Sequence, residues 1–346
     1  MSKKHIRLKD IAEKLNISIA SVSRALSDKP DISQATKEKV LALVQEMNYE
    51  RNEFAIHFKN QQTFTLGLII PQVVHHFFSN VINGILEQAE QRGYNVIIFQ
   101  SNEMLENEIK GIEALKKSMI DGFIISLSDT TKHFDHIIQL QKQAYPVVLI
   151  DKVSDKIACN KVICDDYKGA FDATQHLINL GKTRIAHITG ITQPTTTVLR
   201  FSGYEDALKA QKLPLDMELI KKCNLISQEE GRSATIELLN LSPKIDAIFC
   251  ATDPVAIGAL EAIKSKGLSI PEDIAIIGFS DWKMSSVVNP PLSSVCQSDH
   301  KMGTTAANLL IDEIQNEKED IATVYKTVIV DTYLKPRAST IGKVPT

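Results

Sequence analysis

Residues 8–26 read Leu-Lys-Asp-Ile-Ala-Glu-Lys-Leu-Asn-Ile-Ser-Ile-Ala-Ser-Val-Ser-Arg-Ala-Leu, and this stretch decides the fold of the first part of the chain. Its first half places apolar side chains at i, i+3, i+4 and i+7, which is one face of a helix. Those side chains are Leu8, Ile11, Ala12 and Leu15. Asn16 then interrupts the pattern, and Asn readily adopts the left-handed conformation of a tight turn between helices. The stretch therefore predicts two short helices joined by a tight turn.

The second helix is expected to begin after Ser18, whose hydroxyl can accept a hydrogen bond from a backbone N–H of the first turn. Val22, Ala25 and Leu26 are spaced to face inward. The outer face then carries Ile19, Ala20, Ser21, Ser23 and Arg24. Small, polar and basic groups on such a face suit insertion into a DNA major groove. A helical hairpin with a merely solvated outer face is the alternative.

A third helix is expected after Ser33, with an apolar stripe that completes a unit of about 50 residues. The stripe is Val40, Leu43, Val44, Met47 and Tyr49. Residues 1–60 hold 11 Lys and Arg against 8 Asp and Glu, whereas the whole chain has a net charge of −3. A weakly basic head on an acidic body fits a DNA-binding module joined to another domain.

Composition excludes several classes of protein. The chain has 346 residues and ordinary globular composition, which indicates two or three domains. Its five cysteines are scattered without metal-ligand spacing, so we expect neither a zinc site nor disulfides. There is no apolar run that could span a membrane and no signal-peptide pattern, so we expect a cytoplasmic protein with no membrane contact.

From residue 63 onward, buried strands alternate with amphipathic helices. The expected strands are 64–70, 94–99, 122–126, 146–151, 160–164, 184–189, 247–251 and 274–278. The expected helices are 78–92, 104–117, 136–143, 169–180 and 254–266. This order predicts parallel sheets covered on both faces by helices, and about 270 residues suffice for two of them. Polar residues after the strand ends would line a ligand crevice.

Catalytic and cofactor motifs are absent. No P-loop, GxSxG, HExxH or dinucleotide-binding glycine pattern occurs, so we expect neither an enzyme nor a cofactor. The crevice residues suit binding of a small molecule. A solute-binding protein without DNA function and an enzyme on a doubly wound fold remain the alternatives.

The chain resembles the LacI/GalR family of bacterial transcriptional regulators over essentially its whole length. The resemblance is carried by Lys9-Asp-Ile-Ala-x-x-Leu-x-Ile-Ser-x-x-Ser-Val-Ser-Arg24, Asn48-Tyr49, Leu66-Gly-Leu-Ile-Ile-Pro71, Arg200-Phe-Ser-Gly-Tyr204, Ile270-Pro-Glu-Asp-Ile-Ala-Ile-Ile-Gly-Phe279 and Pro291-Leu-Ser-Ser-Val-Cys-Gln297. It implies an all-α helix-turn-helix head with a hinge helix, then an α/β core of two doubly wound parallel-sheet lobes like periplasmic binding proteins. It also implies a homodimer on a pseudo-palindromic double-stranded operator, usually a repressor, with a sugar or sugar-acid-like effector between the lobes.

The resemblance implies the following domain limits. Residues 1–50 form the helix-turn-helix domain, 51–62 the hinge segment, and 63–340 the effector-binding and dimerisation core. Within the core, the N-lobe is expected to comprise residues 63–163 and 294–322, and the C-lobe residues 164–293 and 323–340.

The resemblance also implies DNA-contacting residues. Ile19, Ala20 and Ser21 would read base edges in the major groove, with Arg24 offering its guanidinium to guanine. The phosphate contacts would come from Arg7, Ser18 and Ser23. Arg7 stands where the family usually has a capping Thr, and its side chain cannot cap in that way.

The hinge segment departs most from the family pattern. Ala55 and Phe58 would enter the minor groove, with Phe58 in place of the usual leucine wedge. Packing of Phe58 against its dimer mate is the alternative. Arg51 and Ile56 replace the family's Pro and Arg, and Ile56 removes a backbone contact.

The expected effector contacts are Phe77, Phe78, Asp151, Arg200, Asp253, Asp281, Trp282 and Gln297. Arg200 could bind a carboxylate or vicinal hydroxyls, or form a structural ion pair with a crevice Asp. Trp282 could stack on a ring or close the lobes. Ser280 stands where many members have an acidic residue, which weakens recognition of hydroxyl pairs there. His75 and His76 are a further polar pair at the mouth.

Overall fold

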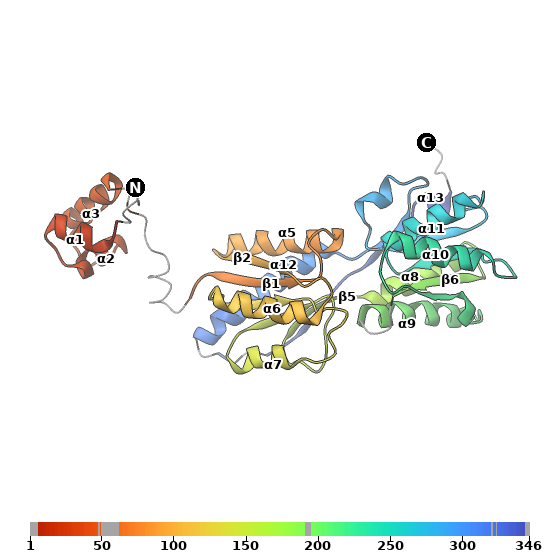
Figure 1. Cartoon of the computed structure of the whole chain (residues 1–346), viewed down its shortest axis with the longest axis horizontal. Helices are drawn as coiled ribbons and strands as arrows, with labels where there is room; N and C mark the ends of the chain where they lie inside the picture. The colour runs from red at the N-terminus through yellow and green to blue at the C-terminus, as the bar shows by residue number, and fades with distance from the viewer. Residues whose placement is uncertain are drawn as a thin grey trace. The chain divides into compact units, whose positions relative to one another are not determined.

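The computed structural model describes residues 6–47, 49, 62–190, 195–319, 321–322 and 324–342. The chain divides into two compact units, Met1–Thr63 and Phe64–Thr346 (Figure 1). We call the first unit the head and the second the core. Most of the predicted hinge, including Ala55 and Phe58, lies outside the described residues.

The head is a three-helix unit. Its helices are α1 (Leu8–Leu15), α2 (Ile19–Leu26) and α3 (Gln34–Glu46). Asn16 ends α1 in the left-handed conformation, with φ 53° and ψ 43°, as its position in the turn predicts. The predicted caps also form, because Ser18 accepts a hydrogen bond from the Ser21 N–H and Ser33 from the Thr36 N–H. The inward faces of the three helices meet in one apolar cluster around Ile11, Val22 and Val40.

The first lobe of the core contains a six-stranded parallel sheet in the order β11-β5-β4-β3-β1-β2. Its strands are β1 (Thr65–Ile70), β2 (Asn95–Gln100), β3 (Gly122–Ile125), β4 (Val147–Ile150), β5 (Asn160–Cys164) and β11 (Thr327–Val330). One face packs against α5 (His76–Gln91) and α12 (Asp299–Lys318). The other packs against α6 (Leu105–Lys117) and α7 (Asp135–Lys142).

The second lobe repeats this plan with the sheet order β12-β10-β9-β8-β6-β7. Its strands are β6 (Ile185–Thr189), β7 (Ile220–Lys222), β8 (Ala247–Cys250), β9 (Ala275–Phe279), β10 (Ser293–Cys296) and β12 (Tyr333–Lys335). All are parallel except β12, which runs antiparallel to β10. Its helices are α8 (Asp166–Asn179), α9 (Thr195–Ala210), α10 (Gln228–Leu239), α11 (Asp253–Ser265) and α13 (Ala338–Ile341), with the 3₁₀ turns η1 (Met217–Leu219) and η2 (Lys283–Ser286). Helices α8 and α9 cover one face of this sheet, and α10 and α11 cover the other (Figure 1).

The predicted fold class of a helical head followed by two parallel-sheet lobes is confirmed. The chain passes between the lobes after β5, between β10 and α12, and after β11. The expected lobe limits at residues 293 and 322 need correction, because β10 belongs to the second sheet beside β9 and β11 to the first beside β5. Strands β10 and β11 are both short and lie where the chain passes from one lobe to the other. Their residue pattern would be the same in either sheet, so the sequence does not assign them. No described helix is long and apolar enough to cross a membrane.

Candidate DNA interface and effector cleft

The outer face of α2 is held in place by local bonds. The Ser18 hydroxyl lies 3.0 Å from the Ser21 backbone nitrogen and 2.9 Å from the Ser21 hydroxyl. Ile19 is 48% exposed, so its apolar side chain is accessible on this face. Arg24 extends along this face, with its Nη1 2.9 Å from Asp31 Oδ2. The face thus offers apolar, hydroxyl and guanidinium groups together.

Arg7 occupies the N-cap position of α1 without capping it through its side chain, as the sequence predicts. The Asp10 carboxylate instead accepts a hydrogen bond from the Arg7 backbone N–H at 2.8 Å. The Arg7 side chain therefore remains available for a phosphate.

Arg200 lies on α9 at the carboxyl end of the second sheet. Its Nε and Nη2 lie 2.8 and 2.7 Å from Asp166 Oδ1, at the start of α8. Its Nη1 donates to the Ala251 carbonyl at 2.7 Å, and the guanidinium carbon lies 3.9 Å from the centre of the Phe279 ring. The structural ion pair left open by the sequence is present. Since three of the five guanidinium N–H groups are used, two remain for a ligand.

Asp151 follows β4 at the carboxyl end of the first sheet. Its backbone is left-handed, with φ 58°, and its side chain is buried. Burial raises the pKa of Asp151 to about 7, against the opposing charge of Lys152. None of the described residues donates a hydrogen bond to its carboxylate. Asp151 is thus a buried acceptor available to a ligand.

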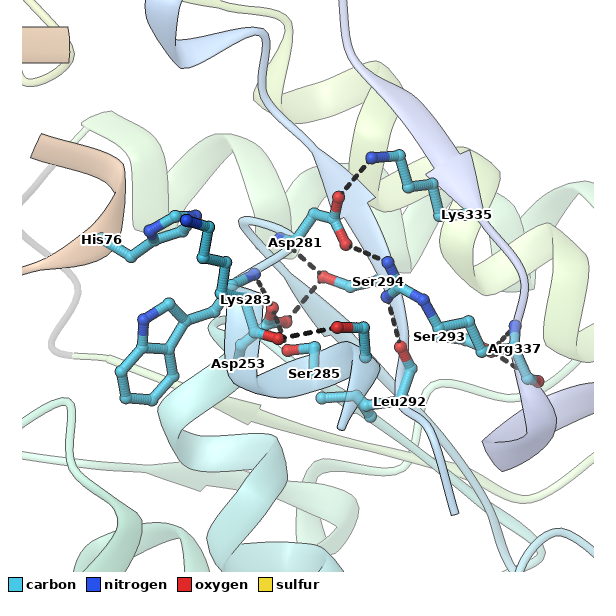
Figure 2. Close-up of polar contacts among 12 residues, drawn as sticks. His76, Asp253, Asp281, Lys283, Ser285, Leu292, Ser293, Ser294, Lys335 and Arg337 are labelled. Carbon is cyan, nitrogen blue, oxygen red and sulfur yellow. Dashed lines mark hydrogen bonds and ion pairs between the residues drawn. The ribbon is translucent and has the colours of Figure 1, made fainter. Parts of the chain in front are cut away.

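Asp253 begins α11 and uses both carboxylate oxygens within the protein. Oδ1 accepts from the Ser294 hydroxyl at 2.6 Å, while Oδ2 accepts from the Trp282 N–H at 2.6 Å and the Ser285 hydroxyl at 2.7 Å (Figure 2). Burial raises the pKa of Asp253, and these bonds oppose the shift. The geometry makes Asp253 the anchor of the loop that carries Trp282 and η2.

Several buried polar atoms at the strand ends have no hydrogen-bond partner among the described residues. They include Ser126 Oγ after β3, Thr189 Oγ1 at the end of β6, Thr252 Oγ1 before α11 and Gln297 Nε2 after β10. The other end of the Gln297 amide is fixed, because Oε1 accepts from the Ser280 hydroxyl at 2.8 Å. Buried polar groups normally have partners. A molecule rich in hydroxyl groups matches this mixed set of donors and acceptors.

Two cavities are lined by residues of both lobes. We use the term effector cleft for these cavities together with Arg200, Asp151 and the unpartnered strand-end atoms named above, none of which lines either cavity. The larger, about 440 Å³, is lined by residues 127–129, 131, 132, 134 and 152–156 of the first lobe and by Thr195 of the second. Thr195 also donates to the Val153 carbonyl at 3.0 Å. The smaller, about 310 Å³, lies between His76 and Asn80 on α5 and the loop that contains Asp281 and Trp282.

Phe77 and Phe78 are the two predicted effector contacts that are buried members of an apolar core cluster. They are 4% and 6% exposed, their ring centres are 5.1 Å apart, and both belong to the apolar core under α5. Neither lines either cavity, and of the predicted contacts only Asp281 and Trp282 do, both in the smaller one. The helical period explains the burial of both rings, because they lie on the stripe of α5 that faces the sheet. The polar neighbour His76 lines the smaller cavity instead.

The structure adds charged residues that the sequence did not single out. Lys152 lies 2.6 Å from both Glu103 and Asp129 beside the larger cavity. Lys335 and Arg337 both bind Asp281 beside the smaller one. The basic run Lys335-Pro-Arg337 was visible in the sequence, but nothing there indicated that its strand reaches the cleft.

Family comparisons agree with both parts of this geometry. Residues 7–52 match bacterial regulatory proteins of the lacI family, and residues 63–335 match the periplasmic binding proteins and sugar-binding domain of the LacI family. The chain belongs to the LacI family. LacI-family proteins are transcriptional regulators and not enzymes, so this member combines a DNA-binding head with an effector-binding core. The solute-binding and enzyme alternatives are thereby set aside.

Individual relatives cover nearly the whole chain. The repressor CytR of Escherichia coli (strain K12) is 32% identical over 310 residues, 90% of each chain. The lac repressor dimer bound to operator and an anti-inducer superposes with a TM-score of 0.85 at 25% identity, covering 97% of this chain and 99% of the other. The regulator CelR in complex with cellobiose gives 0.73 at 26% identity, covering 96% and 99%.

Proposed function

We propose that this LacI-family regulator is a homodimeric repressor of a pseudo-palindromic operator, controlled by a sugar or sugar derivative bound in the effector cleft. The set of unpartnered buried groups at the strand ends carries the proposal. Hydroxyl groups of a sugar can donate to or accept from each of these groups.

Three predicted side chains would orient the effector. Arg200 would direct its two remaining N–H groups at adjacent hydroxyls, because Asp166 and Ala251 hold the guanidinium in place. Asp151 would accept a hydroxyl hydrogen, and Gln297 would donate through Nε2. The relative CelR binds cellobiose, which supports a sugar as the effector class.

The operator would be read by the outer face of α2. Ile19, Ala20 and Ser21 would meet base edges in the major groove, and Arg24 would exchange Asp31 for guanine O6 and N7. Arg7, Ser18 and Ser23 would contact phosphates. Ala55 and Phe58 of the hinge segment would enter the minor groove. The lac repressor relative binds its operator as a dimer, which supports this assignment.

Control would arise from the two lobes. An effector that binds one lobe arrangement more tightly than another shifts the population between them. If only one arrangement holds two heads at the spacing of the operator half-sites, effector and DNA binding are coupled. The sign of that coupling decides whether the effector releases or promotes binding.

Selection from random double-stranded DNA followed by a sugar screen tests the proposal. The full chain should enrich a two-fold symmetric site, and one or more sugars should raise its melting temperature and change its affinity for that site. Arg200→Lys should weaken the sugar effect while the protein still binds the site. An enriched site without symmetry would contradict the dimer. An Arg200→Lys variant with unchanged sugar affinity would contradict the effector assignment.

A further inference from the structure

The smaller cavity of the cleft is unusual in its charge. Asp281 accepts Lys335 Nζ on one carboxylate oxygen and Arg337 Nη2 on the other, each at 2.5 Å (Figure 2). Two cations therefore share one carboxylate, which leaves an excess of one positive charge at this point. Each Asp281 oxygen already accepts from a cation, so two of the roughly four lone-pair sites of this carboxylate are used within the protein.

A third cation, Lys283, lines the same cavity. It is exposed, and its ammonium group pairs with no carboxylate in the described part of the chain. The second carboxylate of the wall is Asp299, which accepts a hydrogen bond from the neutral Asn80 amide at 2.8 Å. Among the side chains that line the cavity, three cations thus stand against two carboxylates, and the buried Asp253 behind the loop directs its oxygens to Trp282, Ser285 and Ser294.

The two inner cations are held in place before any ligand arrives. Arg337 Nη1 donates to the Leu292 carbonyl at 2.7 Å, and the Arg337 N–H donates to the Ser293 hydroxyl at 2.7 Å. Lys335 lies opposite Ser294 in the β10–β12 ladder, and its side chain keeps 40% of its surface exposed. An ammonium group has three N–H donors and Asp281 uses one, so two face other partners. Such preorganisation lowers the cost of binding an anion.

The residue before Asp281 adds no further carboxylate. Position 280 is a serine, and its hydroxyl is bound to Gln297 Oε1. The carboxylates that can meet neutral hydroxyls lie at the strand ends, with Asp151 as the one that has no donor of its own. The cleft therefore offers acceptor chemistry at the strand ends and cationic chemistry at the smaller cavity.

We propose that the smaller cavity is an anion subsite, so that the effector is a sugar acid or a sugar phosphate whose charged group binds Lys335 and Arg337. Lys283 supplies a further cation from the exposed side. This inference rests on the proposed function and specifies its effector class. Carboxylate and phosphate share the same recognition by ammonium and guanidinium groups.

Matched probes test the subsite on the full chain. Glucose, galactose and mannose are compared with their uronates and with their 6-phosphates by calorimetry and thermal shift, and inorganic phosphate and acetate are added alone. We expect an acid or a phosphate to bind roughly tenfold or more tightly than its neutral parent, the gain of one charge-assisted hydrogen bond. Comparison of the affinities of the uronates with those of the 6-phosphates identifies which anion the cavity binds.

Substitutions of the lining residue Lys335 test whether the preference for a charged sugar over its neutral parent arises in the smaller cavity. Lys335→Gln should reduce the preference for the anion roughly tenfold and leave the neutral parent unchanged, while Lys335→Arg should retain it. Lys221→Gln is the matched control, because Lys221 pairs with Glu237 at 3.0 Å in the same lobe but does not line the cavity. A neutral sugar that binds as tightly as its charged forms, in wild type and Lys335→Gln alike, overturns the subsite and leaves the proposed function standing. If none of the probes binds, both proposals fail.

Discussion

Arg24 and Asp31 form an ion pair on the exposed side of the head, with Nη1 2.9 Å from Oδ2 and both side chains about half exposed. Such a surface pair contributes only about 0–1 kcal/mol, so its loss on DNA costs little. Asp31 therefore keeps the guanidinium near the readout face without competing strongly with guanine.

Replacing Arg24 should affect DNA binding far more than folding. Arg24→Ala should weaken operator binding by about 1–3 kcal/mol and abolish the preference at one base pair. Fluorescence anisotropy at fixed salt, on the selected site and on sites with single base changes, measures both effects. Lys14→Ala is the control, because Lys14 forms a similarly exposed pair with Glu46 in the same unit. Equal losses on every sequence would mean that Arg24 contacts phosphate only.

Removing one partner of the Arg200–Asp166 pair should be costly. Both groups are buried, so Arg200→Ala leaves an uncompensated carboxylate and should lower the free energy of unfolding of the core by about 3–5 kcal/mol. Urea unfolding of the full chain measures the change. Lys168→Ala, which removes an exposed pair with Asp172 on α8, should cost less than about 1 kcal/mol. Similar small losses in both variants would contradict a buried, uncompensated charge.

The raised pKa of Asp151 predicts a pH dependence of stability. Between about pH 4 and pH 7 the unfolded carboxylate is ionised while the folded one still holds its proton, so stability falls as the pH rises. Asp151→Asn should reduce that fall by about 2–4 kcal/mol between pH 4 and pH 8. Urea unfolding at several pH values measures the difference. The pKa of Glu313 is also raised to about 7. Glu313 therefore adds the same pH dependence of stability to the wild type and to Asp151→Asn, and it cancels in the comparison.

The close contact of α8 and α9 predicts a low tolerance for side chains at Gly203. A Cβ atom there would lie 2.3 Å from the Tyr167 carbonyl oxygen and 2.9 Å from the Phe171 nitrogen. Gly203→Ala should therefore cost about 1–3 kcal/mol by forcing the helices apart. Since α8 carries Asp166 and α9 carries Arg200, effector affinity should fall as well. Calorimetry with the best sugar probe, with Lys209→Ala on the same helix as control, checks this. Unchanged stability and affinity would show that the helices can separate freely.

Sequence patterns predicted the features of the fold that depend on interactions between residues close together in the chain. The Asn16 turn, the Ser18 and Ser33 caps and the apolar strands follow from spacing and residue type. Sheet membership of β10 and β11 did not follow, since it depends on hydrogen bonds between residues far apart in sequence. The same limit applies to the cleft, where α5 buries Phe77 and Phe78 and β12 brings Lys335 to Asp281.

The passage of the chain between the lobes has a consequence during synthesis. The first sheet needs β11, and one of its faces needs α12, yet the ribosome makes both only after nearly all of the second lobe. At about 5–20 residues per second, β1 to β5 wait on the order of ten seconds with an apolar face uncovered. The head can fold at once, whereas the first sheet of the core keeps that apolar face uncovered until its last strand and helix emerge.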